Sequence, residues 1–154
     1  MSFKAKRLVL NAELEIEGNL EQIFPLLCPT KEYDWIPGWN CKILYSESGF
    51  AEDNCIFRTD FPSEGEVTWV VTCYRPNERI EFTLFGGNFI NRYNISLSSI
   101  SGGRAIMRTE QIYTGLNEQG NEFIRGLSGE AFAREMNALE QMLNHYLKTG
   151  KMLS

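Results

Sequence analysis

The chain has 154 residues, of which 43% are hydrophobic and 12% aromatic, and its formal net charge is −5. A chain of this length is typical of one domain, predicted over residues 1–154, which buries enough surface to fold without disulfides or metals. The negative charge argues against a nucleic-acid partner, because such a partner requires a basic surface. No apolar run is long enough for a membrane span or a signal-peptide core, so we expect a cytoplasmic protein that is not integral to a membrane.

The chain begins with the pattern of a strand followed by short helices. Alternate residues of 8–16 are apolar, which predicts a strand with one buried face. Asn19 and Gln22 have the spacing of a capping box, so we expect a helix over residues 20–27. A second short helix or turn is predicted over residues 30–35, ended by a Pro-Gly pair.

The middle of the chain has the two-residue period of strands, separated by short segments rich in Gly, Pro, Asn and Ser. Six strands are predicted, over residues 40–47, 54–60, 66–75, 79–85, 89–100 and 104–114. Connections this short join antiparallel strands, since parallel strands need long crossovers. The sequence therefore predicts a seven-stranded antiparallel sheet.

The last segment, residues 118–148, has a period of 3.6 residues and a single apolar stripe, which predicts one helix of about thirty residues. The fold class is thus α+β, with a single long helix available to cover one face of the sheet. One helix cannot fill a strongly curved sheet of seven strands. Either large side chains occupy the remaining space or a cavity is left there.

The element order and three sequence strings resemble one family. The strings DWIPGW, VVTCYRPNERIEF and EQIYTGLNEQGNEF resemble the START-like superfamily, also called SRPBCC, which includes Bet v 1-type proteins and polyketide cyclases. The resemblance spans essentially the whole chain and points to bacterial members described as polyketide cyclase/dehydrase-like. It implies a helix-grip fold: a curved seven-stranded sheet wrapped around a long C-terminal helix, two short helices after the first strand, and a deep apolar cavity. The superfamily includes lipid carriers, hormone receptors and cyclases, so the resemblance identifies the fold rather than the activity.

Strand alternation predicts the side chains that would line this cavity. Both faces of residues 66–75 are apolar, and we take the face with Trp69 and Cys73 as the inner one. Mostly apolar walls with a few polar groups are typical of small-molecule pockets, although a fully packed core is the alternative. The predicted ligand-binding residues are Trp35, Trp39, Phe57, Thr59, Trp69, Val71, Phe82, Leu84, Tyr93, Ile95, Thr109, Gln111, Tyr113, Ala131, Phe132, Glu135 and Met136.

Two of these residues, Trp35 and Trp39, flank the Pro-Gly turn that ends the second helical segment. In a helix-grip fold this segment lies at one end of the cavity. The indoles are therefore either a wall or lid of the cavity, or staples that hold the short helices against the sheet.

The candidate catalytic residue is Glu135, which lies within the apolar stripe of the last helix. A carboxylate buried there would have a raised pKa and could act as an acid, a base or a polar anchor for a ligand. Alternatively, the helix is turned so that Glu135 reaches solvent or a surface arginine such as Arg92 or Arg108.

Other chemistries have little support in the sequence. The single histidine, His145, lies near the end of the last helix beside polar residues, so a serine or cysteine nucleophile activated by histidine is not expected. The four cysteines lack metal-ligand spacing and are expected to be buried free thiols that act as small hydrophobic residues. No metal site and no cofactor are predicted.

The sequence supports three functions in order of preference. The first is a small hydrophobic-ligand binding protein whose partner is a small apolar or aromatic molecule, including lipids. The second is an enzyme, a polyketide cyclase or dehydratase that uses the same cavity, with Glu135, Tyr93 or Tyr113 carrying protons. The third is an interaction protein with a filled cavity. The ligand, the occurrence of catalysis and the oligomeric state are left open.

Overall fold

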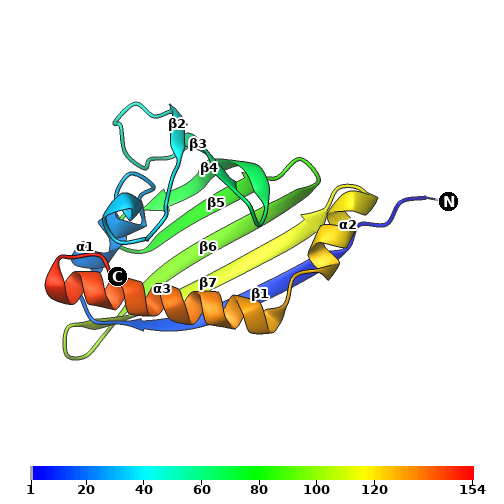
Figure 1. Ribbon diagram of the computed structural model, residues 1–154. Coiled ribbons are helices and arrows are strands. Elements are labelled where there is room, and N and C mark those ends of the chain that lie inside the picture. Colours follow the sequence, from blue (N-terminus) through cyan, green and yellow to red (C-terminus); the bar gives the residue numbers. More distant parts are fainter. Residues whose placement is uncertain (1) are drawn as a thin grey trace.

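Seven antiparallel strands form one curved sheet, and the helices lie on one side of it (Figure 1). The computed structural model describes residues 2–154. The strands are β1 (Arg7–Ile16), β2 (Lys42–Tyr45), β3 (Ile56–Phe61), β4 (Gly65–Arg75), β5 (Arg79–Phe85), β6 (Phe89–Ile100) and β7 (Arg104–Gly115). Their order across the sheet is β1-β7-β6-β5-β4-β3-β2. The predicted seven-stranded sheet is confirmed, although β2 has four residues instead of eight.

Short helices follow β1, as predicted. The α-helix α1 (Leu20–Ile23) continues as the 3-10 helix η1 (Phe24–Leu27), and a second 3-10 turn, η2 (Glu32–Asp34), follows. The side chain of Asn19 accepts a hydrogen bond from the Gln22 amide, and the Asn19 amide donates to the Gln22 side chain, each at 2.9 Å. This reciprocal pair satisfies two amides that a helix start leaves free.

The prediction of one continuous C-terminal helix is wrong. The segment forms α2 (Glu118–Arg125) and α3 (Gly129–Thr149), separated by three residues. Gly126 ends α2, with its amide bonded back to the carbonyl groups of Glu122 and Phe123. Ser128 then caps a new helix by accepting a hydrogen bond from the Ala131 amide. The apolar stripe continues across this break, so hydrophobic periodicity alone did not reveal it.

The long helix α3 packs on β1, at the edge of the sheet (Figure 1). Phe132, Met136 and Leu143 are its buried residues. At the far end of β1, the Asn144 side chain donates to the Glu15 carbonyl and accepts from the Glu17 amide. The helix is therefore fixed along the edge strand by both apolar and polar contacts. No helix among residues 2–154 is long and apolar enough to cross a membrane.

A bulge in β4 changes which residues face inward. Val71 pairs with Phe82 and Cys73 pairs with Glu81, so the register shifts between Val71 and Cys73. Beyond the bulge Tyr74 faces inward, and its ring lies 5.4 Å from that of Phe24. The prediction that Cys73 lies on the inner face is therefore wrong, because simple alternation fails where an extra residue is inserted. The choice of the Trp69 face as the inner one holds up to the bulge.

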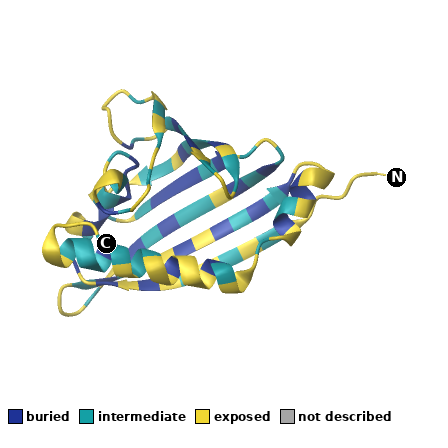
Figure 2. Ribbon diagram, viewed as in Figure 1, coloured by how far each residue is buried: buried dark blue, intermediate teal, exposed yellow. Residues whose placement is uncertain are grey.

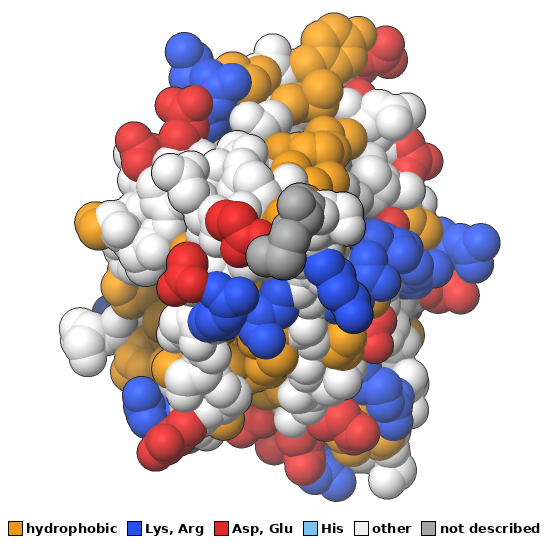
Figure 3. Space-filling view, turned by 90° about the vertical axis from the view of Figure 1, so that its right-hand side faces the viewer, with side chains coloured by type: hydrophobic (Ala, Val, Ile, Leu, Met, Phe, Trp, Pro, Cys, Tyr) orange, Lys and Arg blue, Asp and Glu red, His pale blue; other side chains and the backbone are white. Residues whose placement is uncertain are grey.

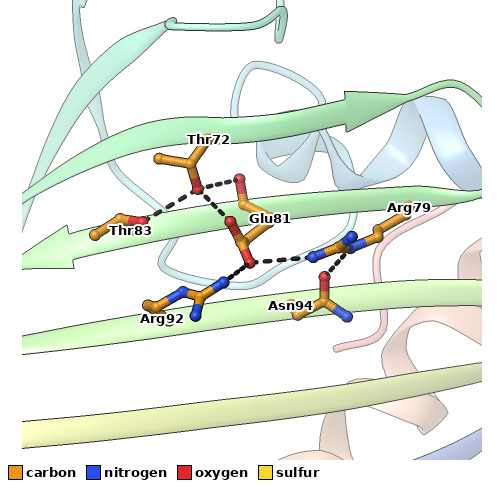
Figure 4. A network of polar contacts seen from close by, with 6 residues as sticks. All are labelled: Thr72, Arg79, Glu81, Thr83, Arg92 and Asn94. Atoms are coloured by element: carbon orange, nitrogen blue, oxygen red, sulfur yellow. Dashed lines mark hydrogen bonds and ion pairs between the residues drawn. The ribbon is translucent and has the colours of Figure 1, made fainter.

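The outer face of the sheet carries a buried charge, Glu81, in a network of polar contacts (Figure 4). Its carboxylate accepts hydrogen bonds from the Thr72 hydroxyl at 2.8 Å, from Arg92 at 2.7 Å and from Arg79 at 3.2 Å. Burial alone would raise the pKa of Glu81, but these hydrogen bonds and the two arginine charges lower it below its ordinary value. The network links β4, β5 and β6 on the side away from the helices.

Candidate ligand-binding site

The predicted inner residues of the strands lie on the concave face and are mostly buried (Figure 2). The buried members of the predicted set are Trp35, Phe57, Thr59, Val71, Phe82, Leu84, Ile95, Thr109, Gln111, Tyr113, Phe132 and Met136. Trp39, Trp69, Tyr93 and Ala131 are partly buried, and Glu135 is exposed. Their role in ligand binding stays a prediction.

A small hollow lies between this face, the short helices and α3. It has a volume of about 40 Å³ and is lined by Leu27, Glu32, Trp35, Trp69, Phe82, Tyr93, Ile95, Met107 and Leu139. A space of this size holds about one or two water molecules and no aromatic ring.

The deep cavity implied by the family resemblance is therefore largely filled, and aromatic rings fill it. Trp69 stacks on Phe57 at 5.1 Å and meets Phe82 edge-on at 5.4 Å. Tyr93 lies next to Phe82 at 6.2 Å. Three of the nine lining residues, Trp69, Phe82 and Tyr93, thus belong to one continuous aromatic layer on the inner face.

The two tryptophans of the Pro-Gly turn act as staples, and one is also a wall. The Trp35 indole N–H donates to the Leu26 carbonyl, and that of Trp39 donates to the Pro29 carbonyl, each at 2.8 Å. Trp35 is 1% exposed and lines the hollow. Trp39 lies outside the hollow, with its ring edge-on to Trp69 at 6.3 Å.

Several predicted residues belong to the packed interior instead of the hollow. The Thr109 hydroxyl donates to the Met136 sulfur at 3.6 Å, beneath α3. Thr59 accepts a hydrogen bond from the Trp69 indole at 2.9 Å, so its hydroxyl is already occupied. Val71 and Leu84 are buried and do not line the hollow.

Four polar side chains lack partners within the described chain, and two of them, Glu32 and Tyr93, line the hollow. The Tyr93 and Tyr113 hydroxyls and the Glu32 and Glu64 carboxylates form no hydrogen bond or ion pair with residues 2–154. Within that range, the only fully enclosed and unpaired side-chain atoms of non-exposed residues are Arg58 Nε and Asn91 Oδ1. The four groups must therefore reach space that water or a ligand can enter.

The pKa values of these groups show how closely the protein surrounds them. Burial raises the pKa of Glu32 well above its ordinary value, and burial together with the Glu135 charge raises that of Glu64. Burial also raises the pKa of Tyr93, helped by Glu32 and Glu135, and that of Tyr113, helped by Glu64 and Glu135. Of these groups, Glu32 on η2 and Tyr93 on β6 line the same hollow.

Glu135 is exposed and does not line the hollow, although its charge contributes to the raised pKa values of Tyr93 and Tyr113. It does not pair with the two arginines that the sequence offered as partners. Arg92 pairs with Glu81, and Arg108 lies 3.7 Å from Glu13.

Sequence reasoning missed Glu32 and Glu64. Both lie in turns, where no periodicity indicates the direction of a side chain. Both residues lie in segments that connect elements at the ends of the sheet, but this position alone does not distinguish them from neighbouring surface residues.

Comparisons with known proteins identify the fold. No protein-family model matches the chain, and no curated protein matches its sequence. Norcoclaurine synthase from Thalictrum flavum, solved in complex with dopamine and hydroxybenzaldehyde, is similar with a TM-score of 0.67 and 14% identity. That match covers 92% of this chain and 89% of the other.

Bacterial proteins give comparable matches. The Mll3558 protein from Rhizobium loti has a TM-score of 0.65 at 11% identity, over 93% of this chain and 99% of its own. DynU16, from the dynemicin biosynthetic locus, has a TM-score of 0.60 at 14% identity over 93% of this chain. The present chain spans about half of DynU16, 48% of its length. At these identities the similarity concerns the fold alone.

Proposed function

We propose that this chain, which has the helix-grip fold of the Bet v 1-like, START-like proteins, binds a small, largely apolar aromatic molecule on the concave face of its sheet. The observation that carries the proposal is that two polar side chains without a hydrogen-bond partner among residues 2–154, Glu32 and Tyr93, line an aromatic-walled hollow. A polar group left without a partner inside a protein costs about 1–3 kcal/mol. A ligand that displaces water from these groups must supply partners to avoid that cost, and it gains by burying apolar surface, at about 25 cal/mol per Å².

The small hollow requires that the ligand open its own space. An aromatic ring occupies a cavity of roughly 150 Å³, several times the volume observed. Leu27 on η1 and Leu139 on α3 line the hollow from elements outside the sheet. Binding should therefore displace α3 or η1 and alter the surroundings of Trp69.

The experiment is a fluorescence titration with N-phenyl-1-naphthylamine, a neutral apolar dye. We expect saturable binding that is lost in Ile95→Phe, because the added ring fills the hollow that Ile95 lines. Ile90→Phe is the matched control, since Ile90 lies on the same strand but on the outer face, opposite Phe85. No saturable binding, or equal loss in both variants, would contradict the proposal and favour an interaction protein with a filled interior.

Native mass spectrometry of the protein purified from its own host would then identify the natural ligand. A retained small molecule that is absent from the Ile95→Phe variant is the expected result.

One observation favours a second candidate, an enzyme with acid–base chemistry of the cyclase or dehydratase kind. Burial raises the pKa of Glu32 and so favours the protonated form that a general acid needs, and Glu32 and Tyr93 line the same hollow. If a bound molecule is converted, Glu32→Gln should abolish conversion while binding persists. Conversion that continues unchanged in this variant would rule out Glu32 as the proton donor.

A further inference from the structure

A second pocket, which we call the loop pocket, lies between η1 and the loop that joins β2 to β3. Both segments lie at the same end of the molecule (Figure 1). The pocket has a volume of about 480 Å³ and is lined by Pro25, Cys28, Lys31, Ser48, Phe50, Ala51, Glu52 and Tyr74. None of these residues lines the hollow on the inner face. Sites for small molecules have volumes of about 300–1,000 Å³, so an aromatic ring can enter the loop pocket without displacing a helix.

The walls of the loop pocket are mainly apolar, and one of them is an exposed aromatic ring. Pro25, Ala51 and the ring of Tyr74 contribute apolar surface, and the Tyr74 ring lies 5.4 Å from that of Phe24. Phe50 is 51% exposed. Apolar surface that stays exposed beside a concave surface is typical of a site that binds another molecule.

Hydrogen bonds within the loop hold Phe50 in this exposed position. The Ser46 hydroxyl donates to the Phe50 carbonyl at 2.7 Å. The Glu52 carboxylate accepts from the Glu47 amide at 3.0 Å and from the Ser48 amide at 2.7 Å. Because the loop is already ordered, a ligand that contacts Phe50 has little conformational entropy to remove.

Two hydrogen-bond donors in the loop pocket have no partner within the described chain. The Tyr74 hydroxyl forms no hydrogen bond with residues 2–154 and is not fully enclosed, so it reaches the space of the pocket. Burial raises the pKa of Tyr74, so this hydroxyl keeps its proton. The Lys31 ammonium group lies 5.8 Å from the centre of the Phe50 ring, within the range of a cation–π contact.

The acceptors in the loop pocket are occupied by the protein itself. Hydrogen bonds from Ser48 and its neighbours lower the pKa of Glu52 to about 2, so the charge of this carboxylate is already met by its own loop. The Cys28 sulfur accepts from the Ala51 amide at 3.1 Å and lies 3.1 Å from the Thr30 hydroxyl. A ligand that offers an acceptor therefore matches the donors that are left.

The charge of Lys31 is available to such a ligand. All the ion pairs found among residues 2–154 are made by arginines, and Lys31 takes part in none of them. Figure 3, which views the end of the molecule near α2, shows lysine and arginine side chains interspersed with acidic ones. In the loop pocket, by contrast, the cation lies beside an aromatic ring and the one carboxylate is held by backbone amides.

We propose that the loop pocket is a second ligand site, which binds a small aromatic molecule that carries a carboxylate. The aromatic part would lie against Phe50 and Pro25, and the carboxylate would accept hydrogen bonds from Lys31 and Tyr74. This site is independent of the proposed function, because no residue lines both the loop pocket and the hollow.

The test compares three compounds with one ring system and one chain length but different head groups: 2-naphthylacetate, 2-naphthylethanol and 2-naphthylethylamine. Each is titrated into the full chain at neutral pH by isothermal calorimetry. We expect the carboxylate to bind about two- to fivefold more tightly than the alcohol, the ratio that an exposed ion pair provides. The amine should bind most weakly, because its charge has the same sign as that of Lys31.

Variants assign this preference to the loop pocket. Lys31→Met should reduce the carboxylate-to-alcohol ratio to near one and leave alcohol binding unchanged, and Lys42→Met, an exposed lysine outside the pocket, is its control. Phe50→Ala should weaken binding of all three compounds at least about threefold, because it removes an aromatic wall. Phe85→Ala is the matched control, since Phe85 is 43% exposed on the outer face, and it should change nothing. If Phe50→Ala is unstable by circular dichroism, Lys31→Met alone carries the test.

The outcomes separate this proposal from the proposed function. Ile95→Phe fills the hollow and not the loop pocket, so naphthylacetate should still bind to that variant. Binding that is lost in Ile95→Phe but unchanged in Phe50→Ala would place the compound in the hollow, which overturns the second site and supports the proposed function. Equal affinities for carboxylate and alcohol, a preference that survives Lys31→Met, or no binding of any of the three compounds would also overturn the second site. The dye titration would still decide the proposed function.

Discussion

Glu81 offers a quantitative test of the outer face of the sheet. We expect Glu81→Gln to lower the free energy of unfolding by about 1–2 kcal/mol. The substitution preserves the shape, and the amide oxygen can still accept from Arg79 and Arg92 while the new NH2 group donates to the Thr72 hydroxyl, but both arginines then bond to a neutral acceptor in place of a carboxylate. Each change costs about 1–1.5 kcal/mol. The two arginine side chains are 39% and 57% exposed, so water compensates part of this loss.

The direction of the pH dependence follows from the lowered pKa of Glu81. Because its contacts lower the pKa despite burial, they favour the charged form by more than desolvation disfavours it. The stabilisation is complete above the unfolded-state pKa of about 4.3 and is lost as the pH falls through the lower folded-state value. The difference between wild type and variant should therefore be constant near neutrality and shrink below about pH 4.

The assay is thermal denaturation followed by circular dichroism across this pH range. A loss of 1–2 kcal/mol corresponds to about 2–8 °C in Tm for a chain of this size. Glu66→Gln is the control, because the Glu66 side chain is 65% exposed and its carboxylate lies 3.7 Å from Arg58 Nε. We expect this substitution to lower the free energy of unfolding by less than about 0.5 kcal/mol. A Glu81 variant as stable as wild type at every pH would refute the reasoning.

Two further predictions concern the inner face and the α2 contact. In a spectrophotometric titration we expect Tyr74, Tyr93 and Tyr113 to ionise above the usual pKa of about 10, because burial disfavours their anions. The native state then keeps protons that the unfolded state loses, so the free energy of unfolding falls as the pH rises through about 10. A single titration shared by all six tyrosines would contradict this prediction. Gly120→Ala should lower the free energy of unfolding, measured by urea denaturation, by at least about 2 kcal/mol. The Cβ of the new alanine would lie 1.9 Å from the Asn88 carbonyl oxygen. Gly129→Ala, where the same carbon meets nothing within 4 Å, is its control and should be close to neutral.

Much of the fold was predictable because its determinants are local. Apolar alternation and turn residues located all seven strands, and Asn19 with Gln22 located the first helix. The break before Ser128 was missed because the apolar stripe continues across it, and the bulge after Val71 was missed because it changes the phase of a strand that is apolar on both faces. Local patterns carry no information about such a change of phase.

The site was less predictable because it depends on volumes and on turns. The inner faces of the strands were assigned correctly up to the bulge, and Tyr93 and Tyr113 were among the predicted residues. The size of the hollow depends on how Trp69, Phe57 and Phe82 pack against one another, which a single sequence does not specify. The inward direction of Glu32 and Glu64 depends on turn geometry, which has no period to follow.

The sheet order has a consequence for synthesis. β1 lies beside β7, with Arg7 opposite Thr114 and Ile16 opposite Ala105, so the strand translated first finds its only partner strand among the last to be translated. While the ribosome works through the intervening residues, the emerging β1 has exposed backbone donors and acceptors and no place to dock. Nascent chains stalled before β7 should thus be protease-sensitive and dependent on chaperones, whereas chains released after α3 should fold in milliseconds to seconds, at the pace of distant strand pairing.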